Sequence, residues 1–345
     1  MSPSNSALPF DDIRALVEAM PGPDLEAVEA VRLRDAQLTK PAGSLGRLEE
    51  IVEWLAAWQG QPKPKVTRPL VAVFAGNHGV AKKGVSAFPP EVTKQMVANF
   101  SNGGAAVNQL CIAYDLGLKV FELALEVPTG DISEEDAFDE AGCAATMAFG
   151  MEALAGGTDL LAIGEMGIAN TTVAAAMLYA LFGGTAEDWV GPGTGVAGDA
   201  LENKRRVVEQ AVSRCGGPLA LDPLEVLRRL GGRELAAMAG VILAARMQQV
   251  PVIIDGFVTT AAAAVLYKMD PTALDHCLFA HISAEPAHRR AVEAMNGKPL
   301  LDLGMRLGEG SGAAVAAGIV KAAAQTHSGM ATFGDAGVTD ASETA

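Results

Sequence analysis

Apolar positions recur at helical spacing in the first part of the chain. Leu, Val, Ala and Trp three to four residues apart predict helices over 11–20, 24–38 and 47–59. Residues 61–69 then carry three prolines and several cations, which is typical of a linker. We therefore expect a helical lobe that precedes a different kind of fold.

Short aliphatic runs alternate with helical patterns after this linker. Runs without polar alternation suit parallel strands that helices cover on both faces. The alternation predicts an α/β fold with a doubly wound, mainly parallel, Rossmann-like sheet, plus the small helical lobe. The strands are expected over 70–75, 118–125, 160–163, 250–254 and 278–282. The helices are expected over 90–100, 105–114, 136–155, 171–182, 201–215, 233–248, 257–267 and 285–295.

The change of pattern predicts how the chain is divided. We expect an α/β substrate-binding domain over 65–325 and a helical lobe over 1–64, which C-terminal elements join. The segment 327–345 is polar and contains glycines, so we expect a partly flexible tail there.

Composition and charge narrow the class of protein. With 345 residues, of which 50% are hydrophobic and 19% charged, the chain can bury a sizeable core. A net charge of -15 argues against a nucleic-acid partner but permits a small anionic substrate, which a few backbone amides and one Lys can hold. The start of the chain lacks the pattern of an export signal, and the uncharged run 166–186 has too short an apolar centre to cross a bilayer. We expect a cytoplasmic protein without a membrane partner.

One carboxylate has an unusual position in the sequence. Glu309 stands between Gly308 and Gly310, directly before an apolar helical stretch. A glutamate on such a loop faces helix N-terminal amides and can be approached closely by a ligand. This pattern favours a catalytic role, and an ordinary turn with a helix-terminal charge is the alternative.

Two glycine-containing segments are candidates for holding a phosphate. The segment 164–172 follows a predicted strand and ends in Asn170, Thr171 and Thr172 at a helix start, so it indicates either a phosphate cradle or helix capping alone. The segment 191–195 is followed by Lys204, which permits a mononucleotide site or a bare loop. Its glycines match neither a P-loop nor a dinucleotide-binding fingerprint.

Other chemistries lack support in the sequence. The segment 281–288 has two histidines and a glutamate, but their spacing is wrong for a zinc site. The chain has no Gly-x-Ser-x-Gly segment for a nucleophilic serine. The sequence therefore predicts no metal site.

Several separated segments together resemble one family across most of the chain. The chain is similar to the nicotinate-nucleotide:dimethylbenzimidazole phosphoribosyltransferases of cobalamin synthesis. The segments that carry the resemblance are 38–49, 77–80, 84–89, 164–172, 191–195 and 303–312, in this order.

The resemblance implies an activity, an assembly and no cofactor. The activity is transfer of the 5-phosphoribosyl group of nicotinate mononucleotide to 5,6-dimethylbenzimidazole, which gives α-ribazole 5′-phosphate and nicotinate with inversion at C1′. The assembly is a homodimer in which the helical lobe of the neighbouring subunit completes the cavity, with an intersubunit role for the loop 40–47.

The resemblance also assigns roles to residues. Glu309 is the expected general base, because the incoming benzimidazole must lose its N–H proton, and Glu165 is expected to support it. The nucleotide is expected to contact Gly167, Ile168, Asn170, Thr171, Thr172, Gly193, Thr194, Gly195, Lys204, Leu307 and Gly308. The acceptor base is expected to contact Ser86, Phe88 and Gln95.

Two alternatives stay open at this point. The same fold and donor could serve a different acceptor, such as adenine, another benzimidazole or a phenol. The chain could also be a non-catalytic nucleotide-binding protein.

Overall fold

A five-stranded parallel sheet forms the centre of the computed structural model, which describes residues 8–339. The sheet order is β2-β1-β3-β4-β5, and each neighbouring pair is parallel, as the sequence predicts. The order reverses between β1 and β3, which is the usual place of a ligand site in a doubly wound sheet. The strands are β1 (Pro69–Ala75), β2 (Gly117–Glu122), β3 (Leu160–Met166), β4 (Val252–Ile254) and β5 (Cys277–Phe279).

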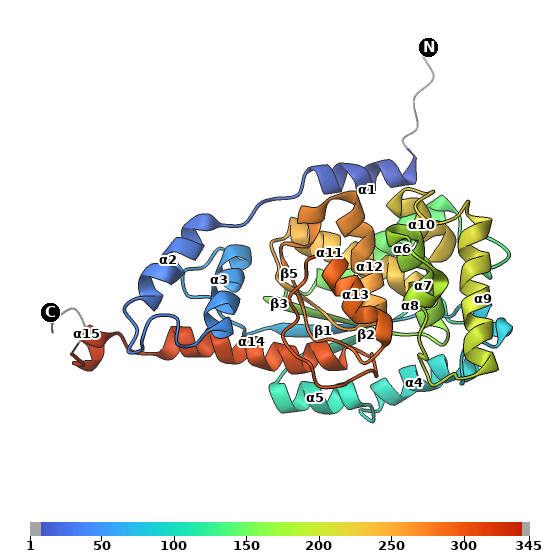
Figure 1. Cartoon of the computed structure of the whole chain (residues 1–345). Helices are drawn as coiled ribbons and strands as arrows, with labels where there is room; N and C mark the ends of the chain where they lie inside the picture. The colour runs from blue at the N-terminus through green and yellow to red at the C-terminus, as the bar shows by residue number, and fades with distance from the viewer. Residues whose placement is uncertain (1–7, 340–345) are drawn as a thin grey trace, which may run out of the picture.

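Helices cover both faces of the sheet (Figure 1). In β1, Ala72 and Phe74 pack into one core, whereas Val71 and Val73 pack into the other, because successive strand residues point to opposite faces. The first core includes α6 (Glu140–Met151), α7 (Asn170–Phe182), α11 (Arg233–Met247) and α12 (Phe257–Met269). The second face is covered by α4 (Glu91–Ser101), α5 (Ala106–Tyr114) and α14 (Ser311–Gly329).

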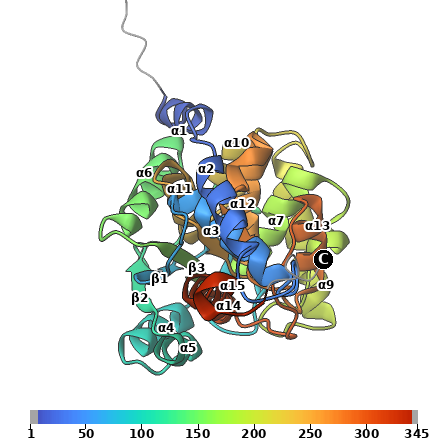
Figure 2. The ribbon, with the colours of Figure 1, turned by 90° about the vertical axis from the view of Figure 1, so that its left-hand side faces the viewer.

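The N-terminal helices divide between two places. Helix α1 (Pro9–Glu18) buries Phe10, Ile13 and Val17 in the first core, so it packs on the α/β part of the molecule. Helices α2 (Leu25–Asp35) and α3 (Arg47–Gln59) instead pack on each other and on α14 (Figures 1 and 2).

The C-terminal segment is tied to these lobe helices. The Arg34 guanidinium donates to the carbonyl oxygens of His327, Ser328 and Met330. Leu38 and Thr332 also form an isolated β-bridge. Residues 327–339, where we expect a partly flexible tail, carry the end of α14 and the helix α15 (Phe333–Ala336). The rest of that predicted tail, 340–345, lies outside the described residues.

Besides α15, two α-helices were not predicted from the sequence. They are α8 (Ala186–Trp189) and α10 (Pro223–Leu230), and the first is only one turn long. Helix α10 follows Asp222, whose carboxylate accepts from the amides of Leu224 and Glu225. The remaining elements are α9 (Asp199–Arg214), α13 (Pro286–Ala294), η1 (Gly79–Lys83), η2 (Glu152–Leu154) and η3 (Pro271–Leu274).

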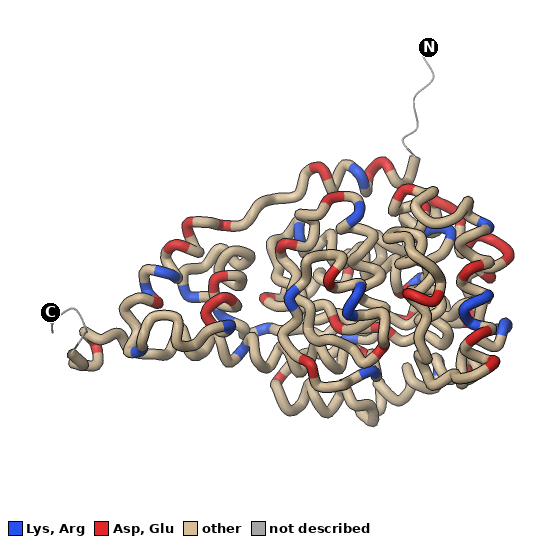
Figure 3. The backbone as a smooth tube through the Cα atoms, in the orientation of Figure 1, with Lys and Arg blue, Asp and Glu red and all other residues tan. Residues whose placement is uncertain are grey.

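Opposite charges are interspersed on the exposed helices (Figure 3). On the lobe, Arg32 lies 2.7 Å from the Glu53 carboxylate, and on α9, Arg205 lies 3.3 Å from Glu202. Positive charge on these elements is thus compensated locally. Within residues 8–339, no helix combines the length and the apolar character that crossing a bilayer requires.

Candidate active site

A cavity of about 700 Å³ opens at the carboxyl ends of β3, β4 and β5. Glycine-containing segments that follow these strands, together with the turn before α14, supply much of its wall. This is the edge at which a doubly wound sheet places its ligand. The lining residues are Phe88, Val92, Met96, Glu165, Met166, Gly167, Ile168, Asn170, Thr171, Gly193, Thr194, Gly256, Phe257, Val258, His281, Ser283, Glu285, Arg306, Leu307, Gly308 and Glu309.

Glu309 lies in a turn with left-handed backbone. Its φ is 64°, between Gly308 at 83° and Gly310 at 77°. This conformation costs a non-glycine residue roughly 1–2 kcal/mol, so the structure around the turn must hold it. Asp255 does so, because its carboxylate accepts from the amide of Gly310 at 3.2 Å and from that of Ala313 at 2.7 Å.

The Glu309 carboxylate is buried and incompletely partnered. The residue is 6% exposed, and its Oε2 has no hydrogen-bond partner. Burial, reinforced by the negative charge of Asp255, raises the pKa of Glu309 to about 7. A carboxylate with a pKa near neutrality can both accept and release a proton at working pH.

Glu165 belongs to a strand, whereas we expected it on a loop. Strand β3 continues to Met166 because its last residues stay paired with β1, where Phe74 is the partner of Glu165. Glycines let this strand end approach the Glu309 turn closely: a Cβ on Gly164 would lie 2.2 Å from the Gly310 nitrogen. The two glutamates therefore reach the cavity from backbone segments in direct contact.

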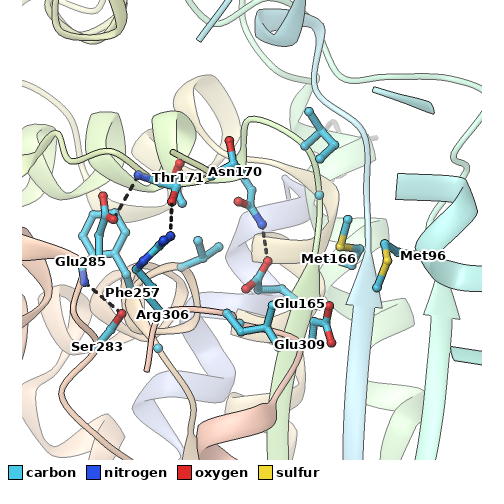
Figure 4. Close-up of a pocket in the computed structure, with 18 of the residues that line it drawn as sticks. Met96, Glu165, Met166, Asn170, Thr171, Phe257, Ser283, Glu285, Arg306 and Glu309 are labelled. Atoms are coloured by element: carbon cyan, nitrogen blue, oxygen red, sulfur yellow. Dashed lines mark hydrogen bonds between the residues drawn. The ribbon is translucent and has the colours of Figure 1, made fainter. Parts of the chain in front are cut away.

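Glu165 is the second carboxylate with a strongly shifted pKa. It accepts a hydrogen bond from the Asn170 side-chain amide (Figure 4). Burial, and then the charges of Asp255, Glu234 and Glu309, raise the pKa of Glu165 to about 8. At neutral pH its carboxyl group is therefore mainly protonated.

Helix α7 begins without a side-chain cap. Its N-cap is Ala169, at φ 75°, and no side chain accepts a capping hydrogen bond there. The prediction that Asn170 or Thr171 caps the helix is wrong, because the Asn170 amide is bonded to Glu165 and the Thr171 hydroxyl accepts from Lys204. Thr172 is fully buried and does not line the cavity.

Lys204 lies behind the cavity wall. Its Nζ donates to Thr171 Oγ1 and to the Gly191 carbonyl oxygen, each at 2.9 Å, and the residue is 1% exposed. Burial lowers the pKa of Lys204 to about 8, and the charge of Glu285 opposes this shift. Position 193 favours glycine, since its φ is 52° and a Cβ there would lie 2.6 Å from Thr171 Oγ1.

Sequence reasoning missed two charged residues around this loop. The Gly193 amide donates to Glu285 Oε2 at 3.1 Å, and the Gly193 carbonyl oxygen accepts from Arg306 Nη1 at 3.3 Å (Figure 4). Glu285 belongs to a segment that we had considered only as a zinc site, and Arg306 is close in sequence to the Glu309 turn. Gly195, which we expected near the nucleotide, does not line the cavity.

Helix α4 and the segment before it provide an apolar wall. Val92 and Met96 line the cavity together with Phe88, because residues four apart lie on the same helix face. Gln95 is exposed on another face of α4 and does not line the cavity, so the structure does not bring it to the expected acceptor pocket. Ser86 also lies outside the lining, and its hydroxyl is 3.0 Å from Thr194 Oγ1.

Further polar side chains support the site from below. His281 lines the cavity with its Nε2 3.8 Å from Asp255 Oδ1. His78 Nε2 lies 2.6 Å from Glu234 Oε1, and this buried pair lies directly under Gly167. Within residues 8–339, His, Cys, Asp and Glu form no group of three or more that could hold a metal ion.

Comparison with known proteins decides the family. A family model described as a phosphoribosyltransferase matches residues 20–338. A nicotinate-nucleotide–dimethylbenzimidazole phosphoribosyltransferase of Brucella anthropi is 69% identical over 335 residues, which are 97% of this chain and 98% of that protein. The chain belongs to this phosphoribosyltransferase family.

Other relatives agree with this assignment. The chain is also 68% identical over 337 residues to a nicotinate-nucleotide–dimethylbenzimidazole phosphoribosyltransferase from Rhizobium leguminosarum bv. trifolii, with 98% of this chain and 99% of that protein covered. Its fold matches the crystal structure of such an enzyme from Thermus thermophilus, with a TM-score of 0.84 and 41% identity over 92% of this chain and 99% of that one. The family resemblance and the fold class that the sequence indicated are confirmed.

The cavity of this phosphoribosyltransferase has two electrostatically different parts. We call Glu165, Asp255 and Glu309 the acidic wall, where burial and then like charges raise the pKa values of the two glutamates. We call Lys204, Arg306 and Glu285 the cationic corner, where opposite charges surround the backbone at Gly193. The first part can exchange protons and stabilise a cation, and the second can hold an anion.

Proposed function

We propose that the chain transfers the 5-phosphoribosyl group of nicotinate mononucleotide to 5,6-dimethylbenzimidazole. The products are α-ribazole 5′-phosphate and nicotinate, with inversion at C1′. The observation that carries this proposal is the Glu309 carboxylate, which is buried in the cavity with an unpartnered Oε2 and a pKa of about 7. The names of the relatives from Brucella and Rhizobium support it.

Glu309 is the general base in this reaction. The nicotinate ring is a pyridinium while it is bonded to C1′. It takes the bonding electron pair onto its ring nitrogen and leaves as a neutral pyridine, so its departure requires no acid. The attacking benzimidazole forms its N–C1′ bond with one nitrogen and must lose the proton from the other. Glu309 Oε2 accepts this proton, a role that is typically worth about 10²- to 10⁴-fold in rate.

Asp255 and Glu165 support the reaction in different ways. Positive charge develops at C1′ as the bond to nicotinate breaks, and the Asp255 carboxylate stabilises it electrostatically. Glu165 is mainly protonated at neutral pH because its pKa is about 8, so its carboxyl group acts as a hydrogen-bond partner of the ribose. The attack on the face opposite to nicotinate produces the inversion.

The donor and the acceptor occupy different sides of the cavity. The phosphate lies at the cationic corner, and the nucleotide contacts Gly167, Ile168, Asn170, Thr171, Thr194, Leu307 and Gly308. The acceptor lies against the apolar wall of Phe88, Val92 and Met96, which offers no hydrogen bond to ring substituents. Such a wall favours a methylated benzimidazole over a more polar base such as adenine.

A substitution pair tests the acceptor wall. Met96→Ala removes apolar contact area, so we expect the KM for dimethylbenzimidazole to rise by about tenfold. Gln95→Ala is the matched control and should leave this KM unchanged. The opposite result, a rise with Gln95→Ala alone, would place the acceptor elsewhere.

A homodimer completes the site in this proposal. The cavity lining runs from Phe88 to Glu309, so the lobe formed by α2 and α3 contributes nothing to the cavity of its own chain. We infer that the lobe of the neighbouring subunit covers the cavity. The predicted division into an α/β domain over 65–325 and a lobe over 1–64 then needs one change, because α1 packs on the α/β domain and only α2 and α3 form the lobe. Mixing two inactive variants, Glu309→Gln and Arg47→Ala, should restore activity through heterodimers with one complete site. If mixing restores nothing, the lobe does not act across subunits.

One assay tests the function itself. The protein is incubated with nicotinate mononucleotide and dimethylbenzimidazole, nicotinate release is followed by chromatography, and the product mass is measured. We expect release that depends on the acceptor and a product with the mass of ribazole phosphate. Competition with adenine and a phenol identifies the preferred acceptor. Tight nucleotide binding without nicotinate release from any acceptor mixture would indicate a non-catalytic nucleotide-binding protein instead.

A further inference from the structure

Glu285 occupies a position in which an anionic ligand would be expected. It immediately precedes α13, lines the cavity and is 4% exposed. Its backbone amide donates to Ser283 Oγ at 3.2 Å, which fixes the start of the helix. Its Oε2 accepts from the Gly193 amide, while Oε1 is buried without a hydrogen-bond partner.

Positively charged groups face this carboxylate from two other elements. Lys204 approaches from α9, and Arg306 approaches from the segment before Glu309. Burial raises the pKa of Glu285, while the charges of Lys204 and Arg306 and the Gly193 amide act in the opposite direction. A backbone amide, an ammonium and a guanidinium are the donors that phosphate groups use in proteins.

Lys204 has donor capacity left. An ammonium group has three N–H donors, and the hydrogen bonds to Thr171 and Gly191 use two of them. A buried lysine without a nearby negative charge is costly, and Glu285 supplies that charge. Glu285 therefore offsets one of the two positive charges of the corner, which belong to Lys204 and Arg306.

We propose that Glu285 is an internal anion that competes with the 5′-phosphate of the donor for the Gly193 amide and offsets the positive charge of Lys204, and thereby limits phosphate affinity. This inference rests on the proposed function, which places the phosphate at the cationic corner. A phosphate dianion and an ionised Glu285 repel each other there. Binding therefore requires Glu285 to leave the amide and to take up a proton from solvent. The same competition favours release of the phosphorylated product.

Titration calorimetry with inorganic phosphate tests the competition. Glu285→Gln keeps an oxygen that can accept from Gly193 and removes only the charge. We expect the phosphate Kd of this variant to fall by about tenfold at neutral pH. Glu202→Gln is the matched control: it removes one negative charge from the exposed face of α9 and should leave the Kd unchanged. If a folded Glu285→Gln protein binds phosphate equally well or more weakly, the inference is overturned. That result is expected if the Glu285 carboxylate only holds the Gly193 loop in place and does not compete with phosphate.

A second measurement needs no variant. Phosphate binding to the unaltered protein is measured in buffers of different ionisation enthalpy, which gives the number of protons taken up or released. We expect net proton uptake near pH 7 that is larger than for Glu285→Gln, and no uptake or net release would overturn the inference. Nicotinate release by the unaltered protein is measured in parallel. If release persists while phosphate competition is absent, only this inference fails, whereas absent release refutes the proposed function.

Discussion

The acidic wall and the cationic corner lie in the same cavity but are built on opposite principles. In the acidic wall, carboxylates lie close together and Glu309 Oε2 has no partner. Burial, and then the neighbouring negative charges, raise the pKa values of Glu165 and Glu309. In the cationic corner, both peptide groups of Gly193 are hydrogen-bonded, and Lys204 has two acceptors and a nearby carboxylate. Groups that must exchange protons are left under-partnered, whereas groups that hold a ligand are positioned by several bonds.

The two parts also differ in backbone strain. The turn at Glu309 keeps a glutamate at φ 64°, while the left-handed positions at the corner, such as Gly193 and Gly195, are glycines. Asp255 holds the strained turn through amides at the start of α14. The strain is thus located where the reacting carboxylate must project into the cavity.

The largest expected effect comes from removing the charge of the acidic wall. In Glu309→Gln, we expect kcat to fall by about 10²- to 10⁴-fold, because no base accepts the benzimidazole proton. The Kd for nicotinate mononucleotide should change by less than about twofold, since the corner is untouched. Steady-state nicotinate release and calorimetry measure the two quantities. An unchanged kcat would remove Glu309 from the mechanism.

A substitution in the cationic corner should change mainly the KM for the donor, whereas Glu309→Gln changes mainly kcat. Lys204→Met loses a charge-assisted contact worth about 1.5–3 kcal/mol, so the donor KM should rise by roughly 10- to 100-fold with a smaller change in kcat. The melting temperature should fall as well, because the Gly191 carbonyl loses its buried donor. Exposed Lys82→Met serves as the control. A loss confined to kcat would argue that Lys204 acts on the chemistry and not on the donor.

The raised pKa values in the acidic wall also predict how activity depends on pH. Glu309 accepts a proton only when it is ionised, so kcat should rise as the pH increases through about 7. Glu165 loses its proton as the pH passes about 8 and then adds negative charge beside an anionic donor, so the donor KM should rise there. A pH series of kcat and KM separates the two effects. In Glu165→Gln the rise of KM near pH 8 should be reduced, and an unaltered rise would assign it to another group.

The smallest effect concerns stability. Glu309→Gly and Glu309→Ala both remove the carboxylate, but only glycine relaxes the left-handed backbone. We expect the Gly variant to have a free energy of unfolding about 1 kcal/mol higher than the Ala variant, with both inactive. Urea denaturation measures this difference. Equal stabilities would show that the turn is not strained.

Much of the fold could be predicted because the spacing of apolar residues along the chain indicates which side of a helix or strand is buried. Helix α3 has the predicted bounds, and β1 differs from its prediction by one residue. Helix α8 was missed because a single turn is too short for a periodic signal. The C-terminal end of α14 was missed because contacts with Arg34, far away in the sequence, stabilise it.

In the candidate site, glycines in turns could be predicted from the sequence, whereas residues on a helix face could not. The glycines around Glu309 are visible in the sequence, and they coincide with left-handed backbone in the structure. Gln95 and Met96 differ by one position, and only the packing of α4 decides that Met96 reaches the cavity. Successive residues of a helix point about 100° apart around its axis. A resemblance between short motifs does not tell which of two neighbouring residues faces the cavity.

The sequence alone determined the parallel α/β architecture, the family and the glutamate in the turn before α14, because strand and helix periods and glycine positions are local properties of the chain. Only the tertiary structure decided which charges meet. Asp255 follows strand β4 and holds the turn that carries Glu309. Glu285 precedes α13, and its charge acts on Lys204 of α9. Their pKa values depend on burial and on distances between residues far apart in sequence, which only the folded chain defines.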